Sequence, residues 1–358
     1  MNSIPLDIHE LDIPTAVGAA GWEDFATADD IRFTVEAQTY GTDELALTAE
    51  EDLPAWQDQE HQPTRFFVAR SGGRIVASAS YESEPGDSPE TVWLRVDVLP
   101  EFRRRGIGTA LARKLHGIAA TDGIRKALLY TVSGEAPGER IAAPTGFGSV
   151  PRANPEVQFL LAQGYRLEQV ERCSRLALPV ETDGLLAAAR THSGSDFAVH
   201  TWIDHTPPRW HADAANLRQR MSTEEPNAGL DEPEDVWTIE RLIEDEERQS
   251  AGPRTSLTAA VEHVPSGHLV GFTTLHVPAE TSRAVAQRDT LVLPEQRGHA
   301  LGMLLKLENL AHLQRERPGH PSVTTFNAEE NRHMLNVNEA LGFVAIGHEG
   351  AWRRDLPR

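Results

Sequence analysis

Apolar and polar positions follow one order twice along the 358-residue chain. The first half opens with alternating residues near Leu6–Ile13 and an acidic helical region that extends to about residue 60. Two apolar runs over 64–82 are then joined by Ser71-Gly72-Gly73, which predicts a β-hairpin. Downstream, the pattern predicts a strand, a helix, a strand, a long loop, a short helix and a final strand, over residues 91–100, 103–123, 126–133, 134–154, 155–165 and 166–179.

The second half repeats this order. An opening strand over 197–207 precedes two predicted helices over 209–222 and 234–252. A hairpin over 254–278 turns at Pro265-Ser266-Gly267. The remaining elements are a strand, a helix, a strand, a helix and the closing strands, over residues 288–294, 301–319, 322–327, 330–343 and 344–356.

A repeat of this length indicates a duplicated domain. We expect residues 1–180 to form the first domain and 196–358 the second, with a linker over 181–195 that contains the short helical run Leu185–Arg190. Strands and helices in this order predict an α/β (α+β) fold class, with a mixed, mostly antiparallel sheet flanked by helices in each domain.

Composition narrows the class of protein. The net charge of −20 argues against a nucleic-acid partner and suits a neutral or cationic substrate. The chain has no apolar run near 18 residues, and its first twelve residues lack a signal-like apolar core, so we expect no membrane partner and a cytoplasmic location. Cys173 is the single cysteine and the histidines lack paired ligand spacing, so we predict no metal site.

The most informative repeat is the turn in the middle of each half. The stretch "LPEFRRRGIGTAL" runs from Leu99 to Leu111, and "LPEQRGHALGMLL" runs from Leu293 to Leu305, with five identities in the first ten positions. Each joins a strand end to a basic helix start, where unpaired N–H groups and the helix dipole form an anion site. No Gly-Lys-Ser/Thr follows and the third dinucleotide-fold glycine is missing, which counts against a nucleotide-binding enzyme.

These motifs resemble the GNAT acetyltransferase superfamily, whose signature is Arg/Gln-x-x-Gly-x-Gly/Ala after a strand ending in Val-x-Pro. The first copy has Val98-Leu99-Pro100 with Arg103, Gly106 and Gly108, and the second has Val292-Leu293-Pro294 with Arg297, Ala300 and Gly302. The resemblance covers nearly the whole chain, and the doubled layout is similar to tandem acetyltransferases such as mycothiol synthase. It implies acetyl-CoA as the cofactor, with its pyrophosphate on these loops.

The resemblance implies cofactor contacts in both halves. In the first half they fall on Val96, Val98, Arg103, Arg104, Arg105, Gly106, Ile107, Gly108 and Thr109. In the second half they fall on Leu291, Val292, Leu293, Arg297, Gly298, His299, Ala300, Leu301, Gly302, Asn327 and Asn331.

The catalytic candidates lie in the second half. Asn331 and Asn338 stand where the family often has Asn and, seven residues later, the Tyr that protonates the leaving thiolate, whereas the first copy has Leu160 at the second position. Helix capping by Asn331 and a structural hydrogen bond by Asn338 are the alternatives. Asp289 begins the strand beside the expected thioester and is the candidate base, a salt bridge being its alternative; its aligned residue in the first copy is Arg95.

Two further carboxylate or imidazole side chains, Glu262 and His276, are runners-up as the base. We therefore expect the second domain to be catalytic and the first to bind acetyl-CoA structurally or to be degenerate. The implied function is transfer of an acetyl group to a primary amine of a small molecule, possibly cationic, by a monomer or homodimer. A non-catalytic acyl-CoA sensor and a protein N-acetyltransferase are the alternatives.

Overall fold

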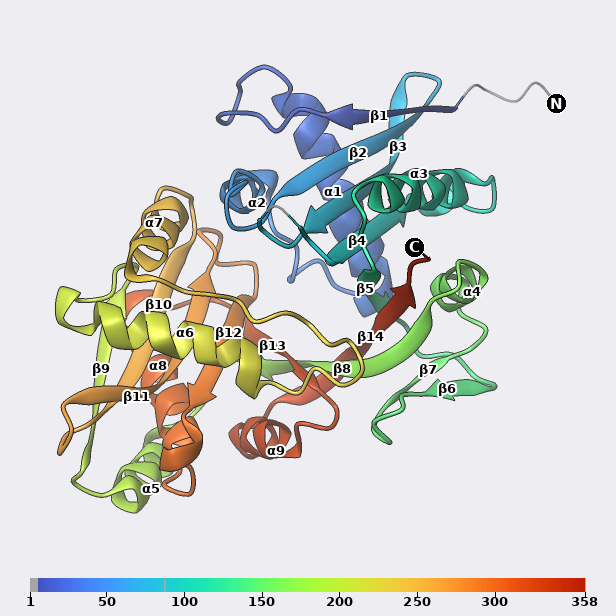
Figure 1. The fold of residues 1–358 in the computed structure, drawn as a ribbon. Coiled ribbons are helices and arrows are strands. Elements are labelled where there is room, and N and C mark those ends of the chain that lie inside the picture. The colour runs from blue at the N-terminus through green and yellow to red at the C-terminus, as the bar shows by residue number, and fades with distance from the viewer. Residues whose placement is uncertain (1–5, 87, 358) are drawn as a thin grey trace.

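Figure 1 shows the fold in a computed structural model, which describes residues 6–86 and 88–357. The first half contains β1 (Leu6–Leu11), α1 (Trp22–Tyr40), α2 (Ala49–Trp56), β2 (Thr64–Ser71), β3 (Arg74–Ser83), β4 (Thr91–Val98), α3 (Ile107–Thr121), β5 (Lys126–Ser133), β6 (Arg140–Ala142), β7 (Ser149–Pro151), α4 (Pro155–Ala162) and β8 (Arg166–Ala177). α5 (Asp183–Ser193) then occupies the predicted linker.

The second half contains β9 (Phe197–Ile203), α6 (His211–Glu224), α7 (Ile239–Ser250), β10 (Thr255–His263), β11 (His268–Val277), β12 (Val285–Val292), α8 (Leu301–Glu316), β13 (Ser322–Ala328), α9 (Arg332–Leu341) and β14 (Val344–Asp355). Short 3-10 turns at Pro100–Phe102, Pro208–Trp210 and Pro294–Gln296 precede α3, α6 and α8. The element order confirms the mixed α/β class and the internal repeat. Among the described residues, no helix is long and apolar enough to span a bilayer.

Two predicted elements differ in detail. The glycine-rich segment 134–154, predicted as a loop, forms the small β6–β7 hairpin. The helix predicted from residue 234 begins at Ile239, because the Thr238 side chain caps it by accepting from the Arg241 N–H. Residues 225–238 instead form an irregular segment that reaches the other half.

The twelve long strands form a single sheet in the order β1-β2-β3-β4-β5-β14-β8-β13-β12-β11-β10-β9. Each half donates its last strand to its neighbour: β14 pairs with β5, and β8 pairs with β13. β8 and β14 also pair with each other, so they cross the middle of the molecule in Figure 1. The pairing therefore crosses the linker that the sequence predicts between two domains.

The exchanged strands contribute to the core of the half that receives them. Trp352 of β14 is fully buried in the first half's core, among residues of β2 to β5, α3 and α4. Leu176 of β8 is buried in the second half's core against α8 and β10 to β12. The apolar burial that stabilises each half thus depends on the other half.

The segments that connect pairs of helices also form hydrogen bonds with strands near the opposite half. In the segment between α1 and α2, Glu44 accepts hydrogen bonds from Arg175 at 3.1 Å and from Ser322 at 3.0 Å. In the corresponding segment between α6 and α7, Glu232 accepts from Tyr130 at 2.7 Å and from Trp93 at 3.3 Å. The two halves are interlocked by strands in the sheet and by loops above it.

Candidate functional site

The first-half site lies where two parallel strands separate. β4 and β5 pair from Thr91–Lys126 to Trp93–Leu128 only, although the strands continue to Val98 and Ser133. The separation opens a cavity of about 530 Å³ between β4, β5, α1, α3 and α4. Most ligand pockets have volumes of roughly 300–1,000 Å³, so this cavity has the size of a ligand site.

Eight of the nine cofactor residues predicted in the first half line this cavity, namely Val96, Val98, Arg103, Arg104, Gly106, Ile107, Gly108 and Thr109. The ninth, Arg105, points elsewhere: its guanidinium donates to the carbonyl of Glu101 and lies over the ring of Phe102. The opposite wall comes from α4, through Glu156, Phe159 and neighbouring residues. The structure therefore gathers the predicted loop around one opening.

The loop presents positive charge at the rim of the cavity. Arg103 fixes the turn by donating its Nε–H to the carbonyl oxygen of Val98 at 3.0 Å. Gly106 adopts the left-handed conformation, with φ +82°, and lets α3 begin at Ile107. The first N–H groups of α3 have no partner inside the helix and direct partial positive charge outward. Within the described residues, none of Arg103, Arg104 and Arg105 forms an ion pair with a carboxylate.

The second-half loop makes the same backbone contact, but its side chains already contact other residues of the protein. Arg297 donates to the carbonyl of Val292 at 3.2 Å, as Arg103 does to Val98. Its guanidinium also pairs with Glu224 at 3.1 Å. The His299 ring packs against Phe197 in a tilted arrangement, with 5.2 Å between ring centroids. The Glu224 carboxylate offsets the charge of Arg297 and so makes the loop less attractive to a phosphate.

The downstream helix of the second half uses its amides for structure. Asn331 caps α9 by accepting from the Met334 N–H at 3.2 Å. Asn338 is 1% exposed and donates to the Asn327 side chain at 2.7 Å. Met303 and Val337 pack against the second-half core. Asn331 thus acts as a helix cap and Asn338 forms a structural hydrogen bond, which are the alternatives to their predicted roles in the site.

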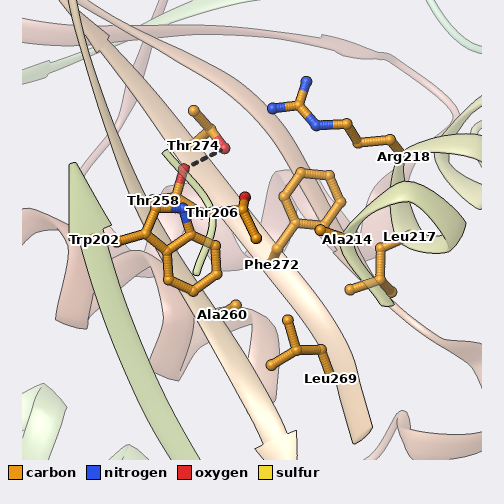
Figure 2. A pocket seen from close by; sticks show the side chains of 10 residues that line it. All are labelled: Trp202, Thr206, Ala214, Leu217, Arg218, Thr258, Ala260, Leu269, Phe272 and Thr274. Atoms are coloured by element: carbon orange, nitrogen blue, oxygen red, sulfur yellow. Dashed lines mark hydrogen bonds between the residues drawn. The ribbon is translucent and has the colours of Figure 1, made fainter. Parts of the chain in front are cut away.

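A smaller pocket of about 20 Å³ lies beneath α6 in the second half (Figure 2). Thr258 and Thr274 hydrogen-bond to each other at 3.2 Å in its wall, and Arg218 reaches toward it from α6. Such a volume holds about one water molecule. This pocket is far too small for a cofactor arm.

A polar network borders the inner end of the first-half cavity. Arg95 donates to Glu36 of α1 and to Asp97 of β4, both at 2.6 Å. Burial alone would raise the pKa of Glu36, but Arg95 and Arg32 outweigh it and lower that pKa. Asp97 lines the cavity itself, as do Val35 and Thr39 on α1. Arg95 therefore organises this wall, a role that its alignment with Asp289 does not suggest.

The family comparison agrees with this geometry. Residues 29–143 match the model of the acetyltransferase (GNAT) family. A solved structure described as a tandem GNAT protein from the clavulanic acid biosynthesis pathway, without AcCoA, superposes with a TM-score of 0.72 and 21% identity over 99% of both chains. The first half is therefore similar to the GNAT acetyltransferase family, and the whole chain shares the fold of a tandem GNAT protein.

Other proteins are similar over most of the chain. The mycothiol acetyltransferase of Mycolicibacterium smegmatis is 24% identical over 293 residues, covering 81% of this chain and 83% of the relative. That of Thermobifida fusca is 26% identical over 286 residues, covering 77% of this chain and 78% of the relative. A GCN5-related N-acetyltransferase from Sphaerobacter thermophilus superposes with a TM-score of 0.63 and 13% identity, covering 99% and 96% of the two chains.

The three candidate bases of the second half differ in their surroundings. Asp289 is half-buried in β12, and its charge helps to raise the pKa of Glu225 to about 7, after the larger effect of burial. A carboxylate oxygen of Glu262 lies 2.7 Å from Nε2 of His200, which is within hydrogen-bond distance. Burial, with Arg288, Arg254 and Arg218, lowers the pKa of His276 well below its usual value and keeps it neutral. Asp289 therefore remains the second-half candidate, because Glu262 is paired with His200 and His276 is a weak base.

A further pair of polar side chains connects the two halves. The hydroxyl of Tyr40, at the end of α1, donates to Glu349 of β14 at 2.8 Å. The two residues belong to different halves, so aligning the repeats does not bring them together. Only the exchange of β14 places Glu349 next to β5, whose Thr131 and Val132 line the first-half cavity.

Proposed function

We propose that this protein is a GNAT acetyltransferase that transfers an acetyl group from acetyl-CoA to a primary amine of a small molecule, and that the first-half cavity holds the cofactor. The observation that carries the proposal is the cavity of about 530 Å³ lined by the loop from Arg103 to Thr109. The small-molecule acceptor is supported by relatives that are mycothiol acetyltransferases.

The residues around the cavity fit the parts of acetyl-CoA. The N-terminus of α3 and the guanidinium of Arg104 suit the diphosphate, because N–H donors and arginine bind phosphate oxygens well. Beyond Trp93, the β4 edge no longer pairs with β5, so its backbone groups are available to the amides of an extended arm. Bound acetyl-CoA supplies the activated acetyl thioester.

The acceptor needs a neutral nitrogen and a route for its proton. The inner wall offers the carboxylates of Glu36 and Asp97, but both are held by Arg95 at 2.6 Å. Backbone N–H groups of the separated β4 edge are suitable donors to a developing oxyanion. The acidic surface, with a net charge of −20, favours a cationic acceptor at the stage of encounter.

Release of CoA thiol from acetyl-CoA tests this function. Purified protein is mixed with acetyl-CoA and, separately, with 1,4-diaminobutane, glucosamine, alaninamide and a lysine-containing peptide. We expect amine-dependent thiol release with at least one of the small amines. Tight binding of CoA without turnover on any amine would support a sensor, and turnover on the peptide alone would support a protein acetyltransferase.

A further inference from the structure

The exchanged strand β14 borders the first-half cavity. Glu349 lies directly across from Val132 of β5, and Gly350 lies across from Thr131. Val132 and Thr131 both line the cavity. Residues that face each other on antiparallel strands point to the same side of the sheet, so the Glu349 side chain shares the Val132 side.

α1 approaches the same carboxyl from the first half. Val35 and Thr39 line the cavity, and Tyr40, the next residue, donates its hydroxyl to Glu349 at 2.8 Å. The Tyr40 ring lies so close to Gly347 that a Cβ at that position would be 2.6 Å from it. The absence of a side chain at Gly347 therefore allows Tyr40 to reach Glu349.

We infer that Glu349 is the proton acceptor of the first-half site, supplied by the last strand of the second half, and that Tyr40 is a positioning residue that orients its carboxylate. This inference rests on the proposed function. It makes the first-half site incomplete without the other half.

The proton and electron pairs balance in this role. Glu349 accepts one proton from the acceptor's ammonium group, which leaves a lone pair on nitrogen. That lone pair forms the new C–N bond with the acetyl carbon as the C–S bond breaks. The second proton lost by nitrogen passes to the leaving sulfur, which departs as the thiol, and Glu349 returns its own proton to solvent.

The surroundings of Glu349 suit a base that works near neutral pH. The groups that face it are Tyr40, Glu36 and Arg32 from α1, Arg95 from β4, and Glu171 and Cys173 from β8. Burial and then Glu36 raise the pKa of its carboxyl, while the Tyr40 hydrogen bond and the two arginines oppose that rise. A proton acceptor is most effective when its pKa approaches the working pH.

Nearby carboxyls are less suited to this role. Asp97 and Glu36 are committed to Arg95. Glu171 faces Glu349 across β8 and β14, one strand further from the cavity, and lies opposite Ala328 of the second half. Burial and the neighbouring carboxylates, Glu349 first, raise the pKa of Glu171 to about 8. Glu171 is also the counterpart of Glu349 in the repeat, seven residues after Gly164 as Glu349 is after Gly342.

Because Glu171 occupies the position in the repeat equivalent to that of Glu349, Glu171→Gln is a matched control for Glu349→Gln. We compare wild type, Glu349→Gln, Glu171→Gln and Tyr40→Phe in the thiol-release assay between pH 6 and 10, using the amine that wild type acetylates. Calorimetric titration with CoA and thermal unfolding monitor binding and folding of each variant. General-base catalysis contributes about 10²–10⁴-fold, so we expect Glu349→Gln to lower kcat at least 100-fold with CoA affinity within twofold of wild type.

The other variants separate a catalytic role from a structural one. Glu171→Gln should keep kcat within about threefold. Tyr40→Phe removes a hydrogen bond that stabilises the charged carboxylate, so the acidic limb of the kcat profile should move to higher pH. Wild-type kcat in Glu349→Gln, or equal losses in Glu349→Gln and Glu171→Gln, would overturn the inference while leaving the proposed function intact. Absence of turnover by wild type with every amine would instead refute the proposed function, and the inference with it.

Discussion

Arg297 makes one contact that its counterpart Arg103 lacks, an ion pair with Glu224 at 3.1 Å. Both arginines otherwise donate Nε–H to the carbonyl at the end of the preceding strand, at 3.2 and 3.0 Å. The two loops therefore share a backbone conformation, but a carboxylate offsets the charge of Arg297 and not that of Arg103. This difference favours the first half as the site of the cofactor's diphosphate.

Arg104 should contribute directly to cofactor affinity. It lines the cavity, and a charge-assisted hydrogen bond is typically worth about 1.5–3 kcal/mol. We expect Arg104→Ala to weaken CoA binding by about tenfold or more in calorimetric titration. Arg297→Ala is the control and should leave the affinity unchanged. A larger loss with Arg297→Ala would assign the diphosphate to the second half.

Asp289 tests whether the second half performs the chemistry. If transfer takes place at the first-half cavity, Asp289→Asn should keep kcat within about threefold of wild type. The variant should also lower the pKa of Glu225, because the Asp289 charge helps to raise it. A loss of 100-fold or more in the thiol-release assay would instead favour a second-half active site with Asp289 as its base.

The exchanged strands should make the halves unfold together. Trp352 of β14 is fully buried in the first half's core, and replacing a buried Trp by Ala typically costs about 3–5 kcal/mol. Differential scanning calorimetry should show one transition for wild type and one transition at lower temperature for Trp352→Ala. Two separate transitions, with only one of them shifted, would show that the halves are independent.

Lys306 should destabilise the fold at neutral and acidic pH. It is 2% exposed in α8, and burial lowers its pKa from 10.5 to about 7. Because the unfolded chain keeps the higher pKa, the stability cost is complete below about pH 7 and disappears as pH rises toward 10.5. Lys306→Met should therefore raise Tm by about 3 °C or more at pH 6 and by much less at pH 10. Equal gains at both pH values would exclude a buried charge as the cause.

Local patterns in the sequence were sufficient to predict much of the fold and the loop that lines the first-half cavity. The glycines near Ser71 and Ser266 predicted both central hairpins, which the structure confirms. The repeated loop predicted eight residues that line the cavity. These features depend on neighbouring residues, where periodicity and turn chemistry are informative.

The rest depends on contacts between distant residues. The alternation within β8 and β14 is the same whether each strand stays in its own half or crosses over, so the sequence pattern does not reveal the exchange. Tyr40 and Glu349 are 309 positions apart and meet only through that exchange. The ion pair of Arg297 with Glu224 likewise comes from α6, outside the repeated motif.

Gly108 and Gly302 offer the most direct test of the central claim, that the first-half cavity holds acetyl-CoA. A Cβ at Gly108 would lie 3.4 Å from Phe159 and 3.6 Å from Val98, both in the cavity wall, whereas a Cβ at Gly302 meets nothing within 4 Å. Calorimetric titration of CoA should show at least 100-fold weaker binding for Gly108→Trp and unchanged binding for Gly302→Trp. Wild-type affinity in Gly108→Trp, with loss of binding in Gly302→Trp, would contradict the account.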